Sequence, residues 1–312
     1  MEYILLIIGF VFLIKGADFF VDGASSIAGK LKVPSLIIGL TVVSMGTSLP
    51  EAAVSISASL SGSNEISLGN VIGSNIFNLL VVVGVASIIL PIMTDSDILK
   101  RDMPINIGIT LALLVMLLDG HLGRIEAIFL LVLMVAYIGL LIWGAMKNRV
   151  EEDEQKILSW PKSFLFVVVG AAAIIAGGQL VVESAKTIAA TLGMSETLIG
   201  LTVVAIGTSL PELVTSIVAA KKGDSGIAMG NVVGSCIFNI LFILGLSGTI
   251  SPMTADATFF IDTAILIGVC AMMWLFAFTK KKTGRVEGAI SVAVYVAYTA
   301  YIIMRAYHVW IF

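Results

Sequence analysis

Residues 39–78 read GLTVVSMGTSLPEAAVSISASLSGSNEISLGNVIGSNIFN, and this stretch decides the fold. It is apolar enough for a membrane helix, yet its centre, GTSLPE, holds a proline, two hydroxyl groups and the carboxylate of Glu51. The stretch returns at 200–239 as GLTVVAIGTSLPELVTSIVAAKKGDSGIAMGNVVGSCIFN, 161 positions later and without a gap. Residues 39–95 and 200–256 are identical at 29 of 57 positions, which indicates an internal duplication. A duplicated hydrophobic segment broken by proline is a strong indication of a transporter's binding site.

The composition is that of an integral membrane protein. Of the 312 residues, 58% are apolar and only 12% are charged, whereas about a quarter are charged in soluble domains. The formal net charge of −3 provides no basic surface that would suit a nucleic acid, and neither Cys236 nor Cys270 has metal-ligand spacing. The N-terminus, MEYILLIIGF, lacks a cationic start and a small-residue cleavage site, so we expect a first membrane span there and no signal peptide.

Ten hydrophobic runs are long enough to cross a bilayer, which takes about 20 residues in a helix. They lie at roughly 3–28, 35–60, 66–91, 103–119, 124–146, 163–188, 196–220, 227–252, 260–279 and 285–309. Runs of this length exclude the short strands of outer-membrane barrels, so the predicted fold class is an all-α integral membrane protein. A hydrophilic linker at 152–161 divides the ten transmembrane helices into two five-helix repeats, 1–151 and 162–312.

The 161-residue offset extends beyond the central motif, since GRIE at 123–126 matches GRVE at 284–287. Because five is odd, the second repeat must enter the membrane in the opposite direction, which gives an inverted-topology repeat. The loops expected on one side of the membrane hold fourteen Lys and Arg residues, and those on the other side hold two. Positive charge accumulates in cytoplasmic loops, so we expect a cell-membrane (inner or plasma membrane) protein with both termini extracytoplasmic.

The carboxylates of Glu51 and Glu212 are predicted to be functional, because acidic side chains within membrane spans are costly and rare. Pro50 and Pro211 lack the N–H that would bond the carbonyl four residues earlier, and the preceding Leu49 and Leu210 are predicted to leave helical geometry. Unwound backbone at this depth is tolerated only where it lines a cavity or is buried in protein. Freed carbonyls, the hydroxyls of GTS and the carboxylates would then form an all-oxygen lining.

The next span of each repeat adds a polar stripe in which residues recur every four positions. The stripes are Asn70, Ser74 and Asn78, and Asn231, Ser235 and Asn239. Ca²⁺ takes about six to eight oxygen ligands of this kind, and Na⁺ asks for the same ligand type with fewer charges. Two carboxylates balance one divalent or two monovalent ions, so competition between them is a natural exchange mechanism. The glycines of GNVIG and GNVVG are interpreted as helix-packing positions.

GTSLPE followed by GNVIGSNIFN, and again by GNVVGSCIFN, resembles the cation/calcium exchanger superfamily, specifically its prokaryotic sodium/calcium branch. The resemblance covers the whole chain and implies ten spans, inverted repeats and alternating access. It implies cation coordination by side chains of both repeats and by two backbone carbonyls. The residues are Glu51, Glu212, Thr47, Thr208, Ser48, Ser209, Ser74, Ser235, Asn78 and Asn239, with the carbonyls of Ser44 and Ala205.

Four departures from the family's patterns concern the coupling ion, the symmetry of the site and regulation. Asn239 stands where the potassium-dependent branch has aspartate, and the glutamate typical of the proton-coupled branch is absent, so Na⁺ is favoured over K⁺ and H⁺. Cys236 replaces the asparagine found at the equivalent Asn75, which breaks the symmetry beside the site. The large cytoplasmic calcium-sensing insert of eukaryotic exchangers is missing, so we expect no such regulation.

The leading hypothesis is a secondary antiporter that lets Na⁺ in and expels Ca²⁺, electrogenically if more than two Na⁺ enter per Ca²⁺. A proton- or other-divalent-coupled exchanger is the alternative among transporters. A cation channel is disfavoured because channels usually build pores from rings of subunits. An intramembrane hydrolase using Ser48 or Ser209 lacks a histidine or lysine base in either motif. We expect no enzymatic activity, no cofactor and no obligate protein partner; Na⁺, Ca²⁺ and the lipid bilayer are the expected partners.

Overall fold

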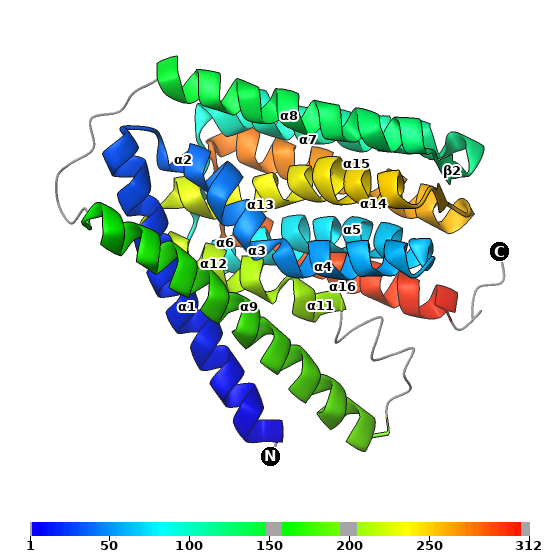
Figure 1. Ribbon diagram of the computed structural model, residues 1–312, viewed down its shortest axis with the longest axis horizontal. Helices are drawn as coiled ribbons and strands as arrows, with labels where there is room; N and C mark the ends of the chain where they lie inside the picture. The colour runs from blue at the N-terminus through cyan, green and yellow to red at the C-terminus, as the bar shows by residue number, and fades with distance from the viewer. Residues whose placement is uncertain (1, 148–157, 194–204, 307–312) are drawn as a thin grey trace.

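The computed structural model describes residues 2–147, 158–193 and 205–306, and it is a bundle of apolar helices (Figure 1). The first half of the chain contains α1 (Glu2–Leu31), α2 (Ser35–Ile38), α3 (Ser44–Thr47), α4 (Leu49–Leu60), α5 (Asn64–Phe77), α6 (Val83–Ile89), α7 (Met103–Met116) and α8 (Arg124–Lys147). The second half contains α9 (Trp160–Thr191), α11 (Ala205–Thr208), α12 (Leu210–Lys221), α13 (Ser225–Phe238), α14 (Gly245–Ile250), α15 (Ala257–Lys280) and α16 (Arg285–Ala306).

Short π-helical segments join several of these helices into longer rods. They are η1 (Gly39–Val43), η2 (Asn78–Val82), η3 (Ile98–Asp102) and η6 (Asn239–Leu244), and a 3₁₀ turn, η4 (Leu117–Asp119), ends α7. Segments η2 and η6 begin at Asn78 and Asn239, the last residues of the two polar stripes. Single π-turns within α-helices occur frequently at functional sites, so their position here is informative.

The described residues form eight helices long and apolar enough to cross a membrane, and a ninth span if the bent pair α2–α3 and α4 is counted as one. These helices agree with nine of the ten predicted spans. The remaining one, predicted at 196–220, begins within residues 194–204, which lie outside the described residues; its described part is α11 and α12. The chain is therefore a helical membrane protein. Besides helices, the described residues contain four strands of two residues each.

The predicted helix breaks are present, but one residue earlier than expected. Leu49 and Leu210 are the first residues of α4 and α12, and it is Ser48 (φ −85°, ψ 10°) and Ser209 (φ −92°, ψ 7°) that depart from helical angles. The proline then occupies the first turn of a new helix, where its missing N–H would have had no helical partner. The axis bends by 50° at Ser48.

Helices α1 and α9 lie side by side and extend away from the rest of the bundle (Figure 1). Their contact is made of glycines, and it is antiparallel: Gly9 faces Gly177, and Gly16 faces Gly170. A Cβ atom built on Gly170 would lie 2.6 Å from the backbone nitrogen of Phe20. Close packing of this kind is typical of membrane helices, which associate through small residues.

Four two-residue strands connect the two halves of the chain. Strand β1 (Ile92–Met93) pairs with β4 (Lys282–Thr283), and β2 (His121–Leu122) pairs with β3 (Met253–Thr254), both antiparallel. Adding 161 to β1 gives β3, and adding 161 to β2 gives β4. Exchanging the two halves therefore converts one pair into the other, which is the relation that a two-fold axis between the halves produces.

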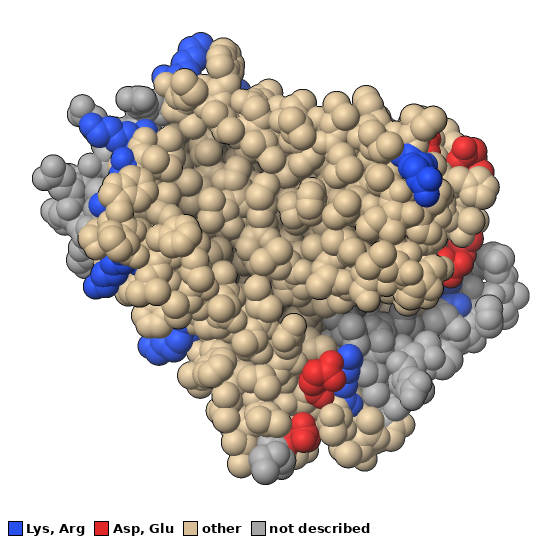
Figure 2. Space-filling model, viewed as in Figure 1, with Lys and Arg blue, Asp and Glu red and all other residues tan. Residues whose placement is uncertain are grey.

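On the face that Figure 2 shows, the middle of the bundle is apolar and charged side chains lie toward its ends. Figure 2 shows almost no charged side chain over the middle of α8, while Lys and Arg gather where α1 and α8 end and α9 begins. The helices α5–α6 and α13–α14 are the most enclosed of the membrane-crossing rods. The polar stripes thus lie in the interior, away from the surface that lipid would cover.

Candidate cation site

Glu51 and Glu212 are both completely buried, each in the first turn of the helix that follows the break. Each carboxylate is bound by a serine of the other half of the chain. Ser209 donates to Glu51 Oε1 at 3.0 Å, and Ser48 donates to Glu212 Oε1 at 2.8 Å. The break residues thus point their hydroxyls at the opposite carboxylate, and the site is built from both halves.

The polar stripes hold the acid-bearing helices in place. Asn70 donates to the carbonyl of Glu51 and, at 2.9 Å, to Ser55, while Asn231 donates to the carbonyl of Glu212 and, at 3.0 Å, to Ser216. In each half, therefore, the stripe helix hydrogen-bonds the backbone of the residue whose carboxylate enters the site. Asn231 is buried and Asn70 half-buried, and both amides bind the helix backbone without neutralising the acid.

Further hydrogen bonds join the GTS segment of the first half to the polar stripe of the second half. The hydroxyl of Thr47 donates to Asn231 Oδ1 at 2.9 Å, and the hydroxyls of Ser48 and Ser235 are hydrogen-bonded at 2.9 Å. The carbonyl of Ser44 accepts from Ser48 N–H at 3.0 Å, and the Ser235 hydroxyl oxygen lies 3.4 Å from that carbonyl. These contacts join the GTS segment of the first half to the stripe of the second.

Buried oxygens of five predicted ligands have no hydrogen-bond partner among the residues that the structure describes. They are Glu51 Oε2, Glu212 Oε2, Asn78 Oδ1, Asn239 Oδ1 and Thr208 Oγ1. Most buried polar atoms in folded proteins have a partner, so a group of unpaired oxygens requires an explanation. None of the ion pairs among the described residues includes either glutamate. Unpaired oxygens together with two buried carboxylates fit a cation ligand set.

The types of ligand atom at the site limit which cations it could bind. Within the described ranges, no group of three or more His, Cys, Asp or Glu side chains comes together. A cation between Glu51 and Glu212 would thus meet two carboxylates and otherwise neutral hydroxyl, amide and carbonyl oxygens. This is the chemistry of hard cations such as Ca²⁺ and Na⁺, and not of zinc or copper.

Most of the twelve predicted ligands lie in this hydrogen-bond network or beside it. Ser74, Thr208 and Asn78 are buried, and α5, which holds Ser74, packs against α11, which ends at Thr208. Their part in cation binding remains a prediction. So does that of the carbonyl of Ala205, the first residue of α11.

Two residues outside the predicted ligand set link the halves at the site. Asn231 accepts from Thr47, and Asn75 donates to the carbonyl of Cys236 at 3.0 Å. The four-residue spacing of the stripe indicated Asn231 as a polar interior position. Asn75 lies one residue after Ser74 and outside that spacing, so the stripe itself did not indicate it.

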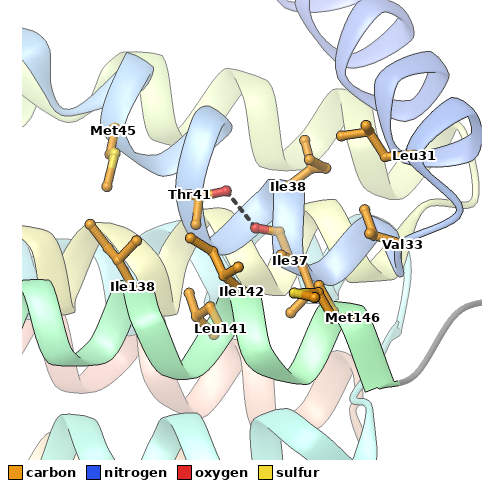
Figure 3. A pocket seen from close by; sticks show the side chains of 11 residues that line it. Leu31, Val33, Ile37, Ile38, Thr41, Met45, Ile138, Leu141, Ile142 and Met146 are labelled. Atoms are coloured by element: carbon orange, nitrogen blue, oxygen red, sulfur yellow. Dashed lines mark hydrogen bonds between the residues drawn. The ribbon is translucent and has the colours of Figure 1, made fainter.

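The apolar hollow beside α2 and α3 is not the cation site. It has a volume of about 480 Å³ and is lined by Leu31 at the end of α1, by Val33, and by residues of α2, η1, α3 and α8 (Figure 3). Its one polar side chain, Thr41, donates its hydroxyl to the carbonyl of Ile37 at 2.6 Å. A single hydroxyl on an otherwise apolar lining cannot supply the six to eight oxygen ligands that Ca²⁺ takes.

Comparison with known proteins gives a consistent result. The family described as sodium/calcium exchanger protein matches residues 1–143 and 162–304, two ranges offset by the same 161 positions. The chain is 39% identical to the putative antiporter CaxA of Alkalimonas amylolytica, over 95% of this chain and 96% of that protein. It is 36% identical to the sodium/calcium exchanger MaX1 of Methanosarcina acetivorans, over 95% and 97%.

A solved structure has the same fold. The sodium-calcium exchanger NCX_Mj, soaked with 2.5 mM Na⁺ and 10 mM Sr²⁺, superposes with a TM-score of 0.85 at 34% identity, covering 96% of this chain and 98% of that one. At this coverage the match extends over both halves of the chain.

Proposed function

The chain belongs to the sodium/calcium exchanger family, and from that premise we propose that it is an antiporter that expels Ca²⁺ in exchange for Na⁺ by alternating access. The observation that carries the proposal is the pair of buried carboxylates. Glu51 and Glu212 each keep one oxygen without a hydrogen bond, and each is held by a serine of the other half. Their two charges balance one Ca²⁺ or two Na⁺, so the two cations compete for one site.

We propose that the ligands are the twelve residues named from the resemblance. The unpaired oxygens of Glu51, Glu212, Asn78, Asn239 and Thr208 support this assignment, because a bound cation would satisfy oxygens that the protein does not. The hydroxyls of Ser48 and Ser209 would turn their lone pairs to the cation when it binds. No enzymatic step and no cofactor is required.

The proposed architecture is ten transmembrane helices in two inverted five-helix repeats, 1–151 and 162–312, joined by the linker 152–161. The exchange relation between the two strand pairs supports it, because repeats related by a two-fold axis in the membrane plane pair in that way. The Lys and Arg residues at one end of the bundle support a cytoplasmic location for that end and extracytoplasmic termini.

A proton-coupled exchanger is the alternative that a direct experiment must separate. In proteoliposomes loaded with Na⁺, we expect ⁴⁵Ca²⁺ uptake when external Na⁺ is removed, and none when a pH gradient of either sign replaces the Na⁺ gradient. Uptake driven by the pH gradient alone would contradict Na⁺ coupling. Uptake without any counter-ion would indicate a channel.

We also propose that exchange is electrogenic. The neutral ligands Thr47, Ser48 and Ser74, with Thr208, Ser209 and Ser235, offer more oxygen positions than two Na⁺ need. If more than two Na⁺ enter per Ca²⁺, an inside-negative potential drives export, by about 2.3 kcal/mol per net charge per 100 mV. Equal flux at opposite potentials clamped with K⁺ and valinomycin would show that exchange is electroneutral.

A further inference from the structure

The equivalent asparagines Asn78 and Asn239 differ in how they are held. Both are completely buried, and each begins a π-helical segment. Segment η2, which begins at Asn78, packs against α12, the helix of Glu212; segment η6, which begins at Asn239, packs against α4, the helix of Glu51. The two amides thus lie in equivalent places beside the two carboxylate-bearing helices. Their hydrogen bonds are not equivalent.

A chain of hydrogen bonds fixes the orientation of Asn239. Asn75 donates its Nδ2 to the carbonyl of Cys236 at 3.0 Å, and Asn239 donates its Nδ2 to Asn75 Oδ1 at 3.0 Å. A backbone carbonyl can only accept, so Asn75 must direct its NH₂ group there and its oxygen to Asn239. Asn239 must in turn direct its NH₂ group to Asn75, which leaves Asn239 Oδ1 without a partner. The network, and not an arbitrary choice of amide rotamer, determines which atom is free.

The first-half residue Asn78 has no equivalent amide to hold it. Cys236 occupies the position equivalent to Asn75, and its thiol lies 3.9 Å from the carbonyl of Asn75. A thiol is a weak donor and a weak acceptor, and it cannot replace the amide oxygen that holds Asn239. Both Nδ2 and Oδ1 of Asn78 are buried and have no hydrogen-bond partner in the described part of the chain.

We infer that Asn75 is a positioning residue that presents the oxygen of Asn239 to the transported cation, and that Cys236 leaves the amide of Asn78 free to turn. The inference rests on the proposed function, since it requires a cation between the two halves. Asn239 is then a preset ligand, whereas Asn78 loses rotational freedom each time a cation binds. A preset ligand increases affinity because less ordering is required on binding.

Exchanging the two residues between the halves tests this inference. Asn75→Cys should release Asn239 and raise the half-saturating Ca²⁺ concentration about fivefold, as expected from the loss of one hydrogen bond. Cys236→Asn should hold Asn78 as well and lower that concentration by a similar factor. The double variant again holds one amide of the two, so its half-saturating concentration should return to within about twofold of the unmodified protein.

A purely structural role predicts a different pattern. If Asn75 and Cys236 only fill space, each substitution is harmful and the double variant is the worst of the three, because the effects of core substitutions then accumulate. That pattern, or an unchanged Ca²⁺ dependence in Cys236→Asn, would overturn the inference. If Asn75→Cys does not fold, Cys236→Asn alone decides, because it should gain affinity.

The controls separate this inference from the proposed function. Ile76→Val, at the buried neighbour of Asn75, should leave the half-saturating Ca²⁺ concentration unchanged. Absence of Na⁺-dependent ⁴⁵Ca²⁺ uptake in the unmodified protein would refute the proposed function. Normal uptake in that protein, with the same Ca²⁺ dependence in all three variants, would refute only the role of Asn75 and Cys236.

Discussion

Ser48 and Ser209 combine two tasks in one residue, because each ends a helix and donates to the carboxylate of the other half. Replacing either with alanine removes a hydroxyl from the proposed site. Each hydroxyl oxygen is a proposed ligand of the cation, so we expect Ser48→Ala and Ser209→Ala each to weaken apparent Ca²⁺ affinity about tenfold, a loss of about 1.4 kcal/mol. Ser57→Ala, at an exposed serine of α4, is the matched control and should behave normally. Unaltered Ca²⁺ dependence in both site variants would count against direct participation of these hydroxyls.

At the scale of single residues, the sequence indicated the two glutamates because buried acids in a membrane span need a reason. It could not indicate that Ser48 binds Glu212 and Ser209 binds Glu51, because these contacts depend on how the two halves are packed. In the sequence, Asn75 stood out only because the equivalent position in the second half is Cys236 and not asparagine. Its hydrogen bond to Asn239 joins residues 164 positions apart, and no local pattern specifies such a pair.

The glycine contact between α1 and α9 gives a prediction at the scale of the element. Gly170→Ala would place a Cβ atom 2.6 Å from the nitrogen of Phe20 and 2.8 Å from the carbonyl of Gly16, and backbone atoms cannot move aside cheaply. We expect a loss of about 1–3 kcal/mol in stability and a lower unfolding temperature in detergent. Gly268→Ala in α15 is the control, because a Cβ there meets nothing within 4 Å. Equal unfolding temperatures of the two variants would contradict the close packing of α1 and α9.

Hydrophobic length predicted where the long helices lie, because each must be long enough to cross the bilayer. It did not predict the π-helical segments or the strand pairs. The helix break was predicted at Leu49 from the general preference of residues before proline, but it lies at Ser48 because proline fits the first turn of a helix. The conformational preference of the residue before proline thus located the break to within one residue. The break lies at Ser48 because α4 already begins at Leu49.

At the scale of the whole molecule, the proposed inverted repeat predicts that equivalent positions lie on opposite sides of the membrane. His121 in β2 and Lys282 in β4 are 161 residues apart, and both are exposed. Because the two native cysteines are buried, a new surface cysteine can be labelled selectively. We expect His121→Cys to react with a membrane-impermeant thiol reagent only from outside the cell, and Lys282→Cys only from the cytoplasmic side. Labelling of both from one side would contradict the inverted topology.

The central claim is that one cation site is built from both repeats and needs both carboxylates. The most direct measurement is Ca²⁺ binding to the purified protein by calorimetry, together with Na⁺-driven ⁴⁵Ca²⁺ uptake, for Glu51→Gln, Glu212→Gln and the control Glu65→Gln at an exposed position of α5. Each site variant keeps the shape of the side chain but removes a charge that the cation requires. We predict that Glu65→Gln binds and transports Ca²⁺ normally and that either site variant alone abolishes both. Near-normal binding and exchange by a folded Glu51→Gln or Glu212→Gln variant would contradict the account.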